Sequence, residues 1–348
     1  MRNKFLFFIL LLNTLLCFGQ TSKIVPVFPK IPQPFNLSEI SEKTIAIPLE
    51  ISAGSIQSIF MTPEYLFTVS LSSVSQFDFS GKFIRKIDCG DYISNTITGD
   101  IIKKELYIPV KRELIVYDFS GNYKKTYKLE NISYGCFFYD NTLWIQSYKY
   151  LANSIFISYE ISYLDLMTGK ESFLPLKVQK GMEMGNFLAI YPGDFFIQKN
   201  SVFFSFQNKD NILYQIQKQE QKINTVLNLK IQFQNQKEES DKSMIVSKGL
   251  AGKYLFVDYI VEDQRYLYME DTKTGKRFHI KIDKINNITS SDGITEDVFN
   301  SGKCTEIKLF NKEGYFYFIK SKESLNMKLI DGHPVKDGPV VFIVKTKE

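Results

Sequence analysis

The chain has 348 residues, and its 43 lysines and arginines against 38 aspartates and glutamates give a formal net charge of +5. The basic residues alternate with apolar ones instead of forming one stripe, which excludes a strong phosphate-binding face and a nucleic-acid partner. Four cysteines and two histidines leave little material for a disulfide framework or a histidine-built metal site.

The first residues have the order of a secretory leader. Arg2 and Lys4 precede an apolar stretch over residues 5–16, and Gly19 is a small residue at a suitable cleavage edge. The apolar stretch is shorter than the ~20 residues that span a bilayer, and no later segment is longer. We therefore predict a signal peptide over residues 1–19, no transmembrane segment, and export to the periplasm or the cell exterior.

Cys17 allows a second interpretation of the leader, as the site of a lipid-modified cysteine. Leu15 and Leu16 stand where such sites carry small residues, which favours cleavage instead. The exported chain would then begin at Gln20.

One hairpin pattern occurs twice near the start of the exported chain, in "QFDFSGKFIRKID" (residues 76–88) and "VYDFSGNYKKTYKL" (residues 116–129). Aromatic and β-branched residues alternate with polar ones up to a Ser-Gly pair, which suits a two-residue primed turn. Asp78 and Asp118 precede the turn, where their side chains can bond the backbone just beyond it. We predict two antiparallel hairpins and a structural role for both aspartates.

Looser copies of this hairpin follow along the chain. Asp165 leads into Thr-Gly in "YLDLMTGKESFLPL", Asp271 does so in "YMEDTKTGKRFHI", and residues 212–229 form a copy that lacks both Asp and Gly. Two further strand-like runs precede each hairpin, which makes four-stranded units of roughly 40–55 residues. Units of this kind are typical of a β-propeller, whose blades stack in a ring.

The units can be counted from their last strands. Five units end near the following residues: Ile87, Leu129, Val178, Leu229 and Ile282. Three strand-like runs remain at the C-terminal end, and "EKTIAIPLE" (residues 42–50) has no blade of its own. Pairing this strand with the last three removes an exposed sheet edge. We therefore predict an all-β fold, a single six-bladed β-propeller domain over residues 20–348, with four-stranded antiparallel blades and a last blade closed by N- and C-terminal strands.

Three of these segments carry a family resemblance: "LSEISEKTIAIPLE", "QFDFSGKFIRKI" and "GPVVFIVKTK". They resemble the exported six-bladed β-propellers of Gram-negative bacteria, which are related in shape to NHL-repeat and TolB-like propellers. The resemblance implies the fold and an exported location. Its motifs are structural, so they specify the fold far better than any activity. Many relatives have a Gly-rich stretch after the first hairpin, where this chain has "DCGDYISN" (residues 88–95).

Motifs for catalysis are scarce. His279 and His333 are the only histidines, and neither stands in a metal-binding spacing or beside a sequence-visible acid or nucleophile. The chain has neither a G-x-S-x-G elbow nor a phosphate-cradling glycine loop. We predict no catalytic residue and no cofactor.

Calcium has one weak candidate site, in "SSDGITED" (residues 290–297), where Asp292, Glu296 and Asp297 supply the oxygen ligands that this cation prefers. The spacing matches no EF-hand loop, and a polar turn is the preferred interpretation.

Two classes of function fit a propeller of this kind. A hydrolase or lyase with an active site at the channel mouth, as in some NHL-like propellers, needs several ionisable residues at the inner strand ends. A binding module for a protein, peptide or glycan can rely on exposed aromatic residues and arginine. The loops opposite the hairpin turns favour binding, and we predict one ligand-binding patch there, formed by Asp91, Tyr92, Lys111, Arg112 and Tyr134.

Overall fold

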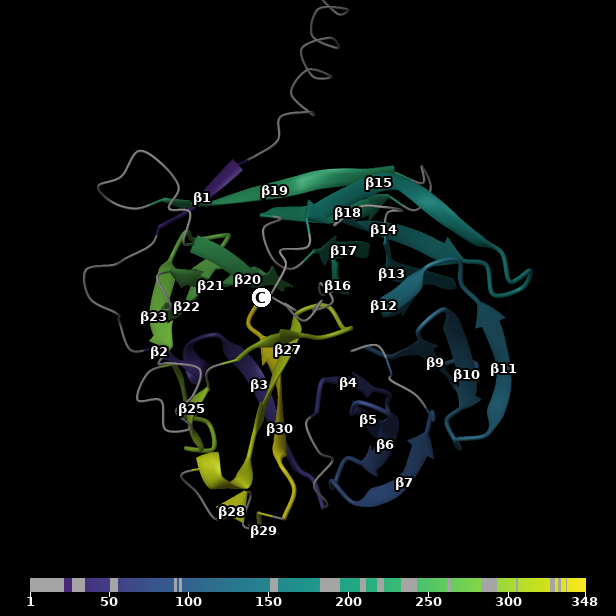
Figure 1. The fold of residues 1–348 in the computed structure, drawn as a ribbon. Coiled ribbons are helices and arrows are strands. Elements are labelled where there is room, and N and C mark those ends of the chain that lie inside the picture. The colour runs from purple at the N-terminus through teal and green to yellow at the C-terminus, as the bar shows by residue number, and fades with distance from the viewer. Residues whose placement is uncertain are drawn as a thin grey trace, which may run out of the picture.

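The computed structural model describes residues 22–26, 35–50, 56–90, 93, 96–150, 156–181, 195–206, 211–217, 222–232, 243–261, 264–282, 293–304, 306–325, 329–330, 333–335 and 337–348. Their sheets form a ring, as Figure 1 shows, so the chain is an all-β propeller. None of the helices in these ranges has the length and apolar character required to cross a membrane.

Blades 1 to 3 are four-stranded antiparallel sheets whose strands follow the chain order from the inside of the ring outward (Figure 1). Blade 1 contains β4 (Ser58–Met61), β5 (Tyr65–Val69), β6 (Ser73–Asp78) and β7 (Phe83–Asp88). Blade 2 contains β8 (Thr98–Asp100), β9 (Glu105–Val110), β10 (Glu113–Asp118) and β11 (Tyr123–Lys128). Blade 3 contains β12 (Ile132–Tyr139), β13 (Thr142–Tyr150), β14 (Phe156–Leu164) and β15 (Glu171–Gly181).

Blades 4 and 5 repeat this order. Blade 4 contains β16 (Phe195–Gln198), β17 (Ser201–Ser205), β18 (Ile212–Gln217) and β19 (Lys222–Gln232), and blade 5 contains β20 (Ser243–Ala251), β21 (Tyr254–Val261), β22 (Gln264–Asp271) and β23 (Arg277–Ile282). The outer strands of the first five blades therefore end close to the five predicted unit ends, and this part of the prediction is confirmed.

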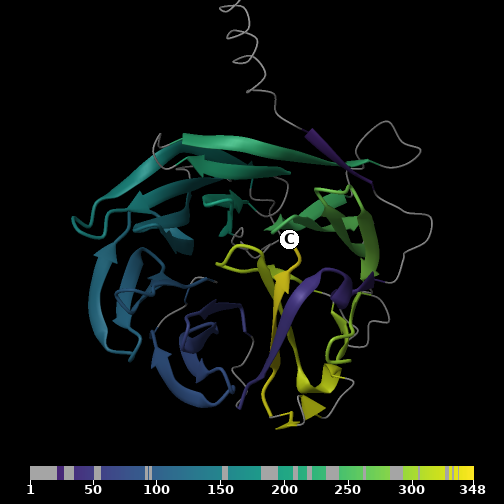
Figure 2. The ribbon, with the colours of Figure 1, turned by 180° about the vertical axis from the view of Figure 1, so that it is seen from behind.

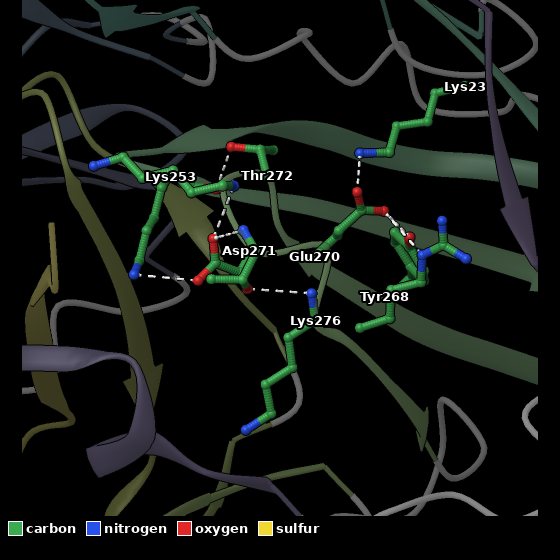
Figure 3. Close-up of polar contacts among 10 residues, drawn as sticks. Lys23, Lys253, Tyr268, Glu270, Asp271, Thr272 and Lys276 are labelled. Atoms are coloured by element: carbon green, nitrogen blue, oxygen red, sulfur yellow. Dashed lines mark hydrogen bonds and ion pairs between the residues drawn. The ribbon is translucent and has the colours of Figure 1, made fainter.

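An N-terminal strand that the sequence analysis does not predict, β1 (Ser22–Pro26), adds in parallel to the outer edge of β19. Val25 is fully buried in the core between blades 4 and 5. Lys23 forms an ion pair with the buried Glu270 of blade 5, as Figure 3 shows. The strand thus fastens two neighbouring blades together from outside.

A small blade follows blade 5. Blade 6 contains three short strands, β2 (Phe35–Asn36), β24 (Ile294–Glu296) and β25 (Gly302–Cys304). The central strand β24 pairs in parallel with β2 and antiparallel with β25. A short 3-10 helix, η1 (Leu37–Glu39), follows β2 in the chain. Phe35 and Ile294 are fully buried, in one core cluster with Phe278 of blade 5 and Phe342 of the last blade. The small blade is therefore packed between two larger ones.

The described residues consequently form seven blades, and the predicted count of six is wrong. The strands of blade 6 are two or three residues long, too short for a visible alternation of apolar and polar residues. Blade 6 is also too small to separate its neighbours completely. A Cβ atom on Gly249 of β20 would lie 2.0 Å from Leu309 Cδ1 on the inner strand of blade 7, so these two blades touch directly.

Blade 7 is closed by both ends of the chain, as predicted. It contains β26 (Lys308–Leu309), β27 (Tyr315–Lys320), β30 (Val340–Thr346) and the N-terminal β3 (Ser41–Pro48). Figure 2 shows β3 beside β30, and their register places Thr44 opposite Val344 and Pro48 opposite Val340. The connection before β30 contains η2 (Lys322–Ser324) and a hairpin of β28 (Leu329–Ile330) and β29 (His333–Pro334).

The repeated hairpins are confirmed, but their turn differs from the expected type. Asp78 Oδ1 accepts a hydrogen bond from the Ser80 N–H (2.8 Å), and the Gly81 N–H donates to the Asp78 carbonyl (2.9 Å). In blade 2, the Gly121 N–H likewise donates to the Asp118 carbonyl (2.9 Å). The Asp78 N–H also donates to the Lys82 carbonyl (3.1 Å), so three residues form the loop between this hydrogen-bonded pair, and only the glycine among them has positive φ. The turn is therefore a three-residue loop with an adjacent bulge, not a two-residue primed turn.

The hydrophobic core lies between neighbouring blades. Phe67 of blade 1 contacts Phe119 of blade 2, with 5.5 Å between ring centroids, and Trp144 of blade 3 is buried in the cluster that faces blade 4. The abundance of phenylalanine and tyrosine in the sequence follows from this geometry, because facing sheets need large side chains to fill the space between them.

Candidate functional site

The antiparallel strand order gives every four-stranded blade two different ends. We call one end the hairpin side, because it carries the turns between first and second strands and between third and fourth strands, including those after Asp78 and Asp118. The other end, the crossover side, carries the turn between second and third strands and the passage to the next blade. Lys111 and Arg112 join β9 to β10 and therefore lie on the crossover side, as predicted.

The turn at Lys111 and Arg112 is held in place by the end of its own blade and by the following blade. The Lys111 carbonyl accepts hydrogen bonds from the Ser133 N–H (2.8 Å) and the Ser133 hydroxyl (3.0 Å), and the Arg112 carbonyl accepts one from the Leu129 N–H (2.9 Å). Lys111 has a φ of 53°, and both cationic side chains are exposed. A fixed backbone thus presents two positive charges to solvent.

Tyr134 lies elsewhere than expected. Its side chain is only 5% exposed and belongs to the core between blades 3 and 4, where its ring makes an edge contact with Tyr159 at 5.8 Å. Burial raises the pKa of Tyr134 well above its ordinary value. The strand that carries Tyr134 turns it into the core because a bulge follows Ser133, and the sequence alone does not reveal that bulge.

Of the five residues in the predicted patch, the structure therefore places Lys111 and Arg112 on the surface and Tyr134 in the core. Asp91 and Tyr92 lie outside the described residues. The ligand-binding role of the patch stays a prediction.

A buried polar cluster that the sequence analysis does not identify lies beside this turn. Glu160 accepts a hydrogen bond from the Asn131 amide (2.9 Å) and forms an ion pair with Lys149 (2.9 Å), and it pairs across the sheet with Ser147. Ser147 in turn pairs with Ser133, the residue that holds the Lys111 carbonyl. The signal in the sequence is the recurrence of polar residues at every second position of β14, at Ser158, Glu160 and Ser162. Through Ser133, the cluster holds the backbone of the exposed turn in place.

The inner strands offer little for acid–base chemistry in the part of the chain that the structure describes. Asp100, at the end of β8, is the one carboxylate on the described inner strands. Its Oδ1 accepts hydrogen bonds from the backbone N–H groups of Ile102 (2.9 Å) and Lys103 (3.0 Å), so it shapes a turn.

The weak calcium candidate has two described members. Glu296 is fully buried, and its carboxylate accepts hydrogen bonds from three backbone N–H groups of its own loop, among them Val298 and Ser301 at 2.9 Å. Asp297 accepts a hydrogen bond from the Ser38 N–H (2.9 Å), which ties η1 to blade 6. Asp292 lies outside the described residues. Within the described ranges no three His, Cys, Asp or Glu side chains are grouped as metal ligands.

The side chain of His279 is buried among aromatic residues of blade 5. The side chain of His333 lies outside the described residues. The His279 ring stacks against Tyr259 and Tyr266, with centroids 5.7 and 5.2 Å away, and its Nε2 is hydrogen-bonded to the Tyr259 hydroxyl. Burial lowers the pKa of His279 from 6.5 to about 4.

This lowered pKa predicts a loss of stability in acid. The unfolded chain binds a proton at His279 near pH 6.5 and the folded chain only near pH 4, so the stabilisation is complete above pH 6.5 and declines as the pH falls toward 4. A shift of this size corresponds to about 3 kcal/mol. We expect His279→Phe to flatten the pH dependence of urea unfolding between these limits, and an unchanged pH profile would contradict the assignment.

One comparison with a solved structure agrees with this architecture. A structure from Bacteroides fragilis, of a protein described as exported, superimposes with a TM-score of 0.63 at 13% identity, over 94% of this chain and 100% of the other. BamB from Moraxella catarrhalis gives a TM-score of 0.41 at 11% identity, over 87% of this chain and 99% of BamB. The extracellular domain of a two-component system from B. thetaiotaomicron gives 0.43 at 13% identity, over 69% of this chain and 30% of that one.

At 13% identity, the Bacteroides fragilis structure shows a shared fold alone. None of the curated proteins matches the sequence. The sequence model of one family, described as "Domain of unknown function (DUF4934)", matches residues 23–343, which is nearly the whole described propeller. The chain belongs to this family.

Proposed function

We propose that the protein is an exported, NHL-like or TolB-like propeller scaffold that binds a protein, peptide or glycan ligand through the crossover side of its blades. Export rests on the leader expected over residues 1–19, and the similar Bacteroides fragilis protein is itself described as exported. Binding, not catalysis, is favoured because the described inner strands carry one carboxylate, Asp100, which is occupied by its own turn.

The observation that carries the proposal is the fixed turn at Lys111 and Arg112. Two hydrogen bonds from Ser133 of the following blade and one from Leu129, next to β11, hold its two carbonyl groups, so little conformational entropy remains to be lost when a ligand binds. Arginine is also enriched among the residues that dominate binding interfaces. The double variant Lys111→Gln, Arg112→Gln removes both charges and leaves these backbone bonds intact.

We expect this double variant to weaken ligand capture from the native cell envelope by about tenfold or more, since truncating a hot-spot residue costs about 2 kcal/mol. Its melting temperature should stay close to that of the parent, because both side chains are exposed. The measurement is quantitative pull-down with immobilised protein, followed by a binding titration of each captured ligand.

A matched control removes the same charge from the outer rim, through Lys86→Gln and Lys125→Gln on β7 and β11. Both lysines are exposed. Loss of a ligand in the first variant alone supports the proposal, and equal capture by the parent and both variants overturns it.

A further inference from the structure

Large apolar side chains are exposed on the hairpin side of blades 1 to 3. Ile102 is 92% exposed in the turn between β8 and β9, and Met167 is 96% exposed in the turn between β14 and β15. Ile101, Phe79 and Tyr123 stand beside or within turns of the same side and are also exposed. Soluble proteins seldom hold several such residues in water on one side without a partner for them.

Ordered turns keep these side chains in solvent. Asp100 Oδ1 accepts hydrogen bonds from the N–H groups of Ile102 (2.9 Å) and Lys103 (3.0 Å). Asp165 Oδ1 accepts one from the Met167 N–H (2.8 Å), and the Gly169 N–H donates to the Asp165 carbonyl at 2.8 Å. The backbone is therefore fixed by its aspartate, and the apolar side chain at the tip contributes nothing to holding the turn.

Blade 5 provides an internal comparison for the Met167 turn. Its sequence "DTKTGK" replaces "DLMTGK" and forms the same bonds, with the Lys273 N–H donating to Asp271 Oδ1 at 2.9 Å and the Gly275 N–H to the Asp271 carbonyl at 2.7 Å. Figure 3 shows this blade 5 turn around Asp271. Lysine occupies the tip there, so the turn itself does not require methionine at position 167.

Lysines surround the apolar tips. Those on the same turns are exposed: Lys82, Lys103, Lys104 and Lys170. The aspartates of these turns direct one carboxylate oxygen to backbone N–H groups. Two of the lysines also form long ion pairs, Lys103 with Asp100 at 3.8 Å and Lys104 with Glu64 at 3.9 Å. Apolar tips between cations combine the two features that attract a protein to an anionic bilayer surface.

We propose that the hairpin side of blades 1 to 3 docks on an anionic lipid bilayer, with Ile102 and Met167 inserted among the headgroups and the lysines facing lipid phosphates. The tips stand on separate turns of separate blades, with charged residues between them. A protein partner would need a separate pocket for each tip, whereas a bilayer accepts all of them at once. The crossover side, with Lys111 and Arg112, would then point away from the membrane.

The test uses protein purified after export and vesicles of phosphatidylethanolamine and phosphatidylglycerol, with phosphatidylcholine vesicles for comparison. We expect the parent to float with the anionic vesicles and to dissociate as the salt concentration rises. Ile102→Ser and Met167→Ser should each weaken binding by about tenfold, since each removes most of one buried apolar side chain. Leu71→Ser, which removes an exposed apolar residue on the crossover side, should bind like the parent.

A fluorescence measurement locates the contact. Trp144 is buried, so its emission gives a constant background, and Ile102→Trp should show a blue shift on addition of anionic vesicles, whereas Leu71→Trp should not. Failure of the parent to bind vesicles, equal binding by all the serine variants, or equal shifts of both tryptophans would overturn the proposal. If the parent binds no vesicles but captures a protein that Ile102→Ser and Met167→Ser do not capture, the surface belongs to a protein partner instead. None of these outcomes depends on the crossover-side ligand.

Discussion

Deletion of residues 339–348 is expected to abolish cooperative folding. The deletion removes β30, which pairs with β27 on one side and with β3 on the other. Five consecutive side chains of β30 are at most 1% exposed: Val340, Val341, Phe342, Ile343 and Val344. Burial of each contributes about 1.5–3 kcal/mol, and together they match the whole stability of an ordinary domain, about 5–15 kcal/mol.

Thermal unfolding followed by circular dichroism measures this effect, with deletion of Lys347 and Glu348 alone as the control. The short deletion removes one backbone hydrogen bond, from the Lys347 N–H to the Ile40 carbonyl (2.7 Å), and should lower the melting temperature only slightly. A long deletion that melts like the parent would show that blade 7 does not close the ring.

The second large loss of stability is expected for Gly81→Ala. Gly81 has a φ of 77°, and a Cβ atom there would lie 2.0 Å from the Pro48 carbonyl oxygen at the end of β3. The left-handed backbone costs an alanine about 1–2 kcal/mol, and the clash adds to this because the obstructing atom belongs to a paired strand. We expect a loss of about 3 kcal/mol or more in the free energy of unfolding, within the range of strained sites.

Gly275→Ala separates the two causes. Gly275 has nearly the same φ of 72° in the blade 5 turn, but no atom of the described residues lies within 4 Å of its added Cβ. Urea unfolding should therefore show the backbone cost alone, about 1–2 kcal/mol. Equal losses in the two variants would mean that Pro48 can move away and that the contact between the first hairpin and the closing strand is not rigid.

Much of the ring could be predicted because its large blades have long strands in which apolar and polar residues alternate, and turns with recurring Asp and Gly residues. The hairpins after Asp78 and Asp118 and the pairing of β3 with β30 follow from such patterns. Blade 6 could not be predicted, since its pairing of Phe35 with Ile294 joins strands too short to carry a period. The same limit applies to β1, whose place on β19 depends on contacts with two blades.

The candidate site was predictable only where it depends on topology. Alternating turns place Lys111 and Arg112 on the crossover side whatever the details of packing. Tyr134 required knowledge of a bulge, and a bulge shifts every later side chain to the other face of the sheet. The exposure of Ile102 and Met167 could not be predicted either, because an apolar residue next to an aspartate-capped turn is ordinarily expected to be buried in the core.

The pairing of the two chain ends also sets an order of events during folding. Glu42 on β3 and Lys345 on β30 form an ion pair at 2.6 Å although 303 residues separate them, and Ser38 reaches Asp297 across 259 residues. Contacts between such distant residues form late, because the intervening loop must close first. Because β2 and β3 precede their partners in the chain, they stay unpaired until the C-terminal strands are available, and the first five blades can assemble while both flanking edges stay open. Interruption at that stage would leave an aggregation-prone intermediate, so the rate at which the last residues arrive limits how long the protein is exposed to misassembly.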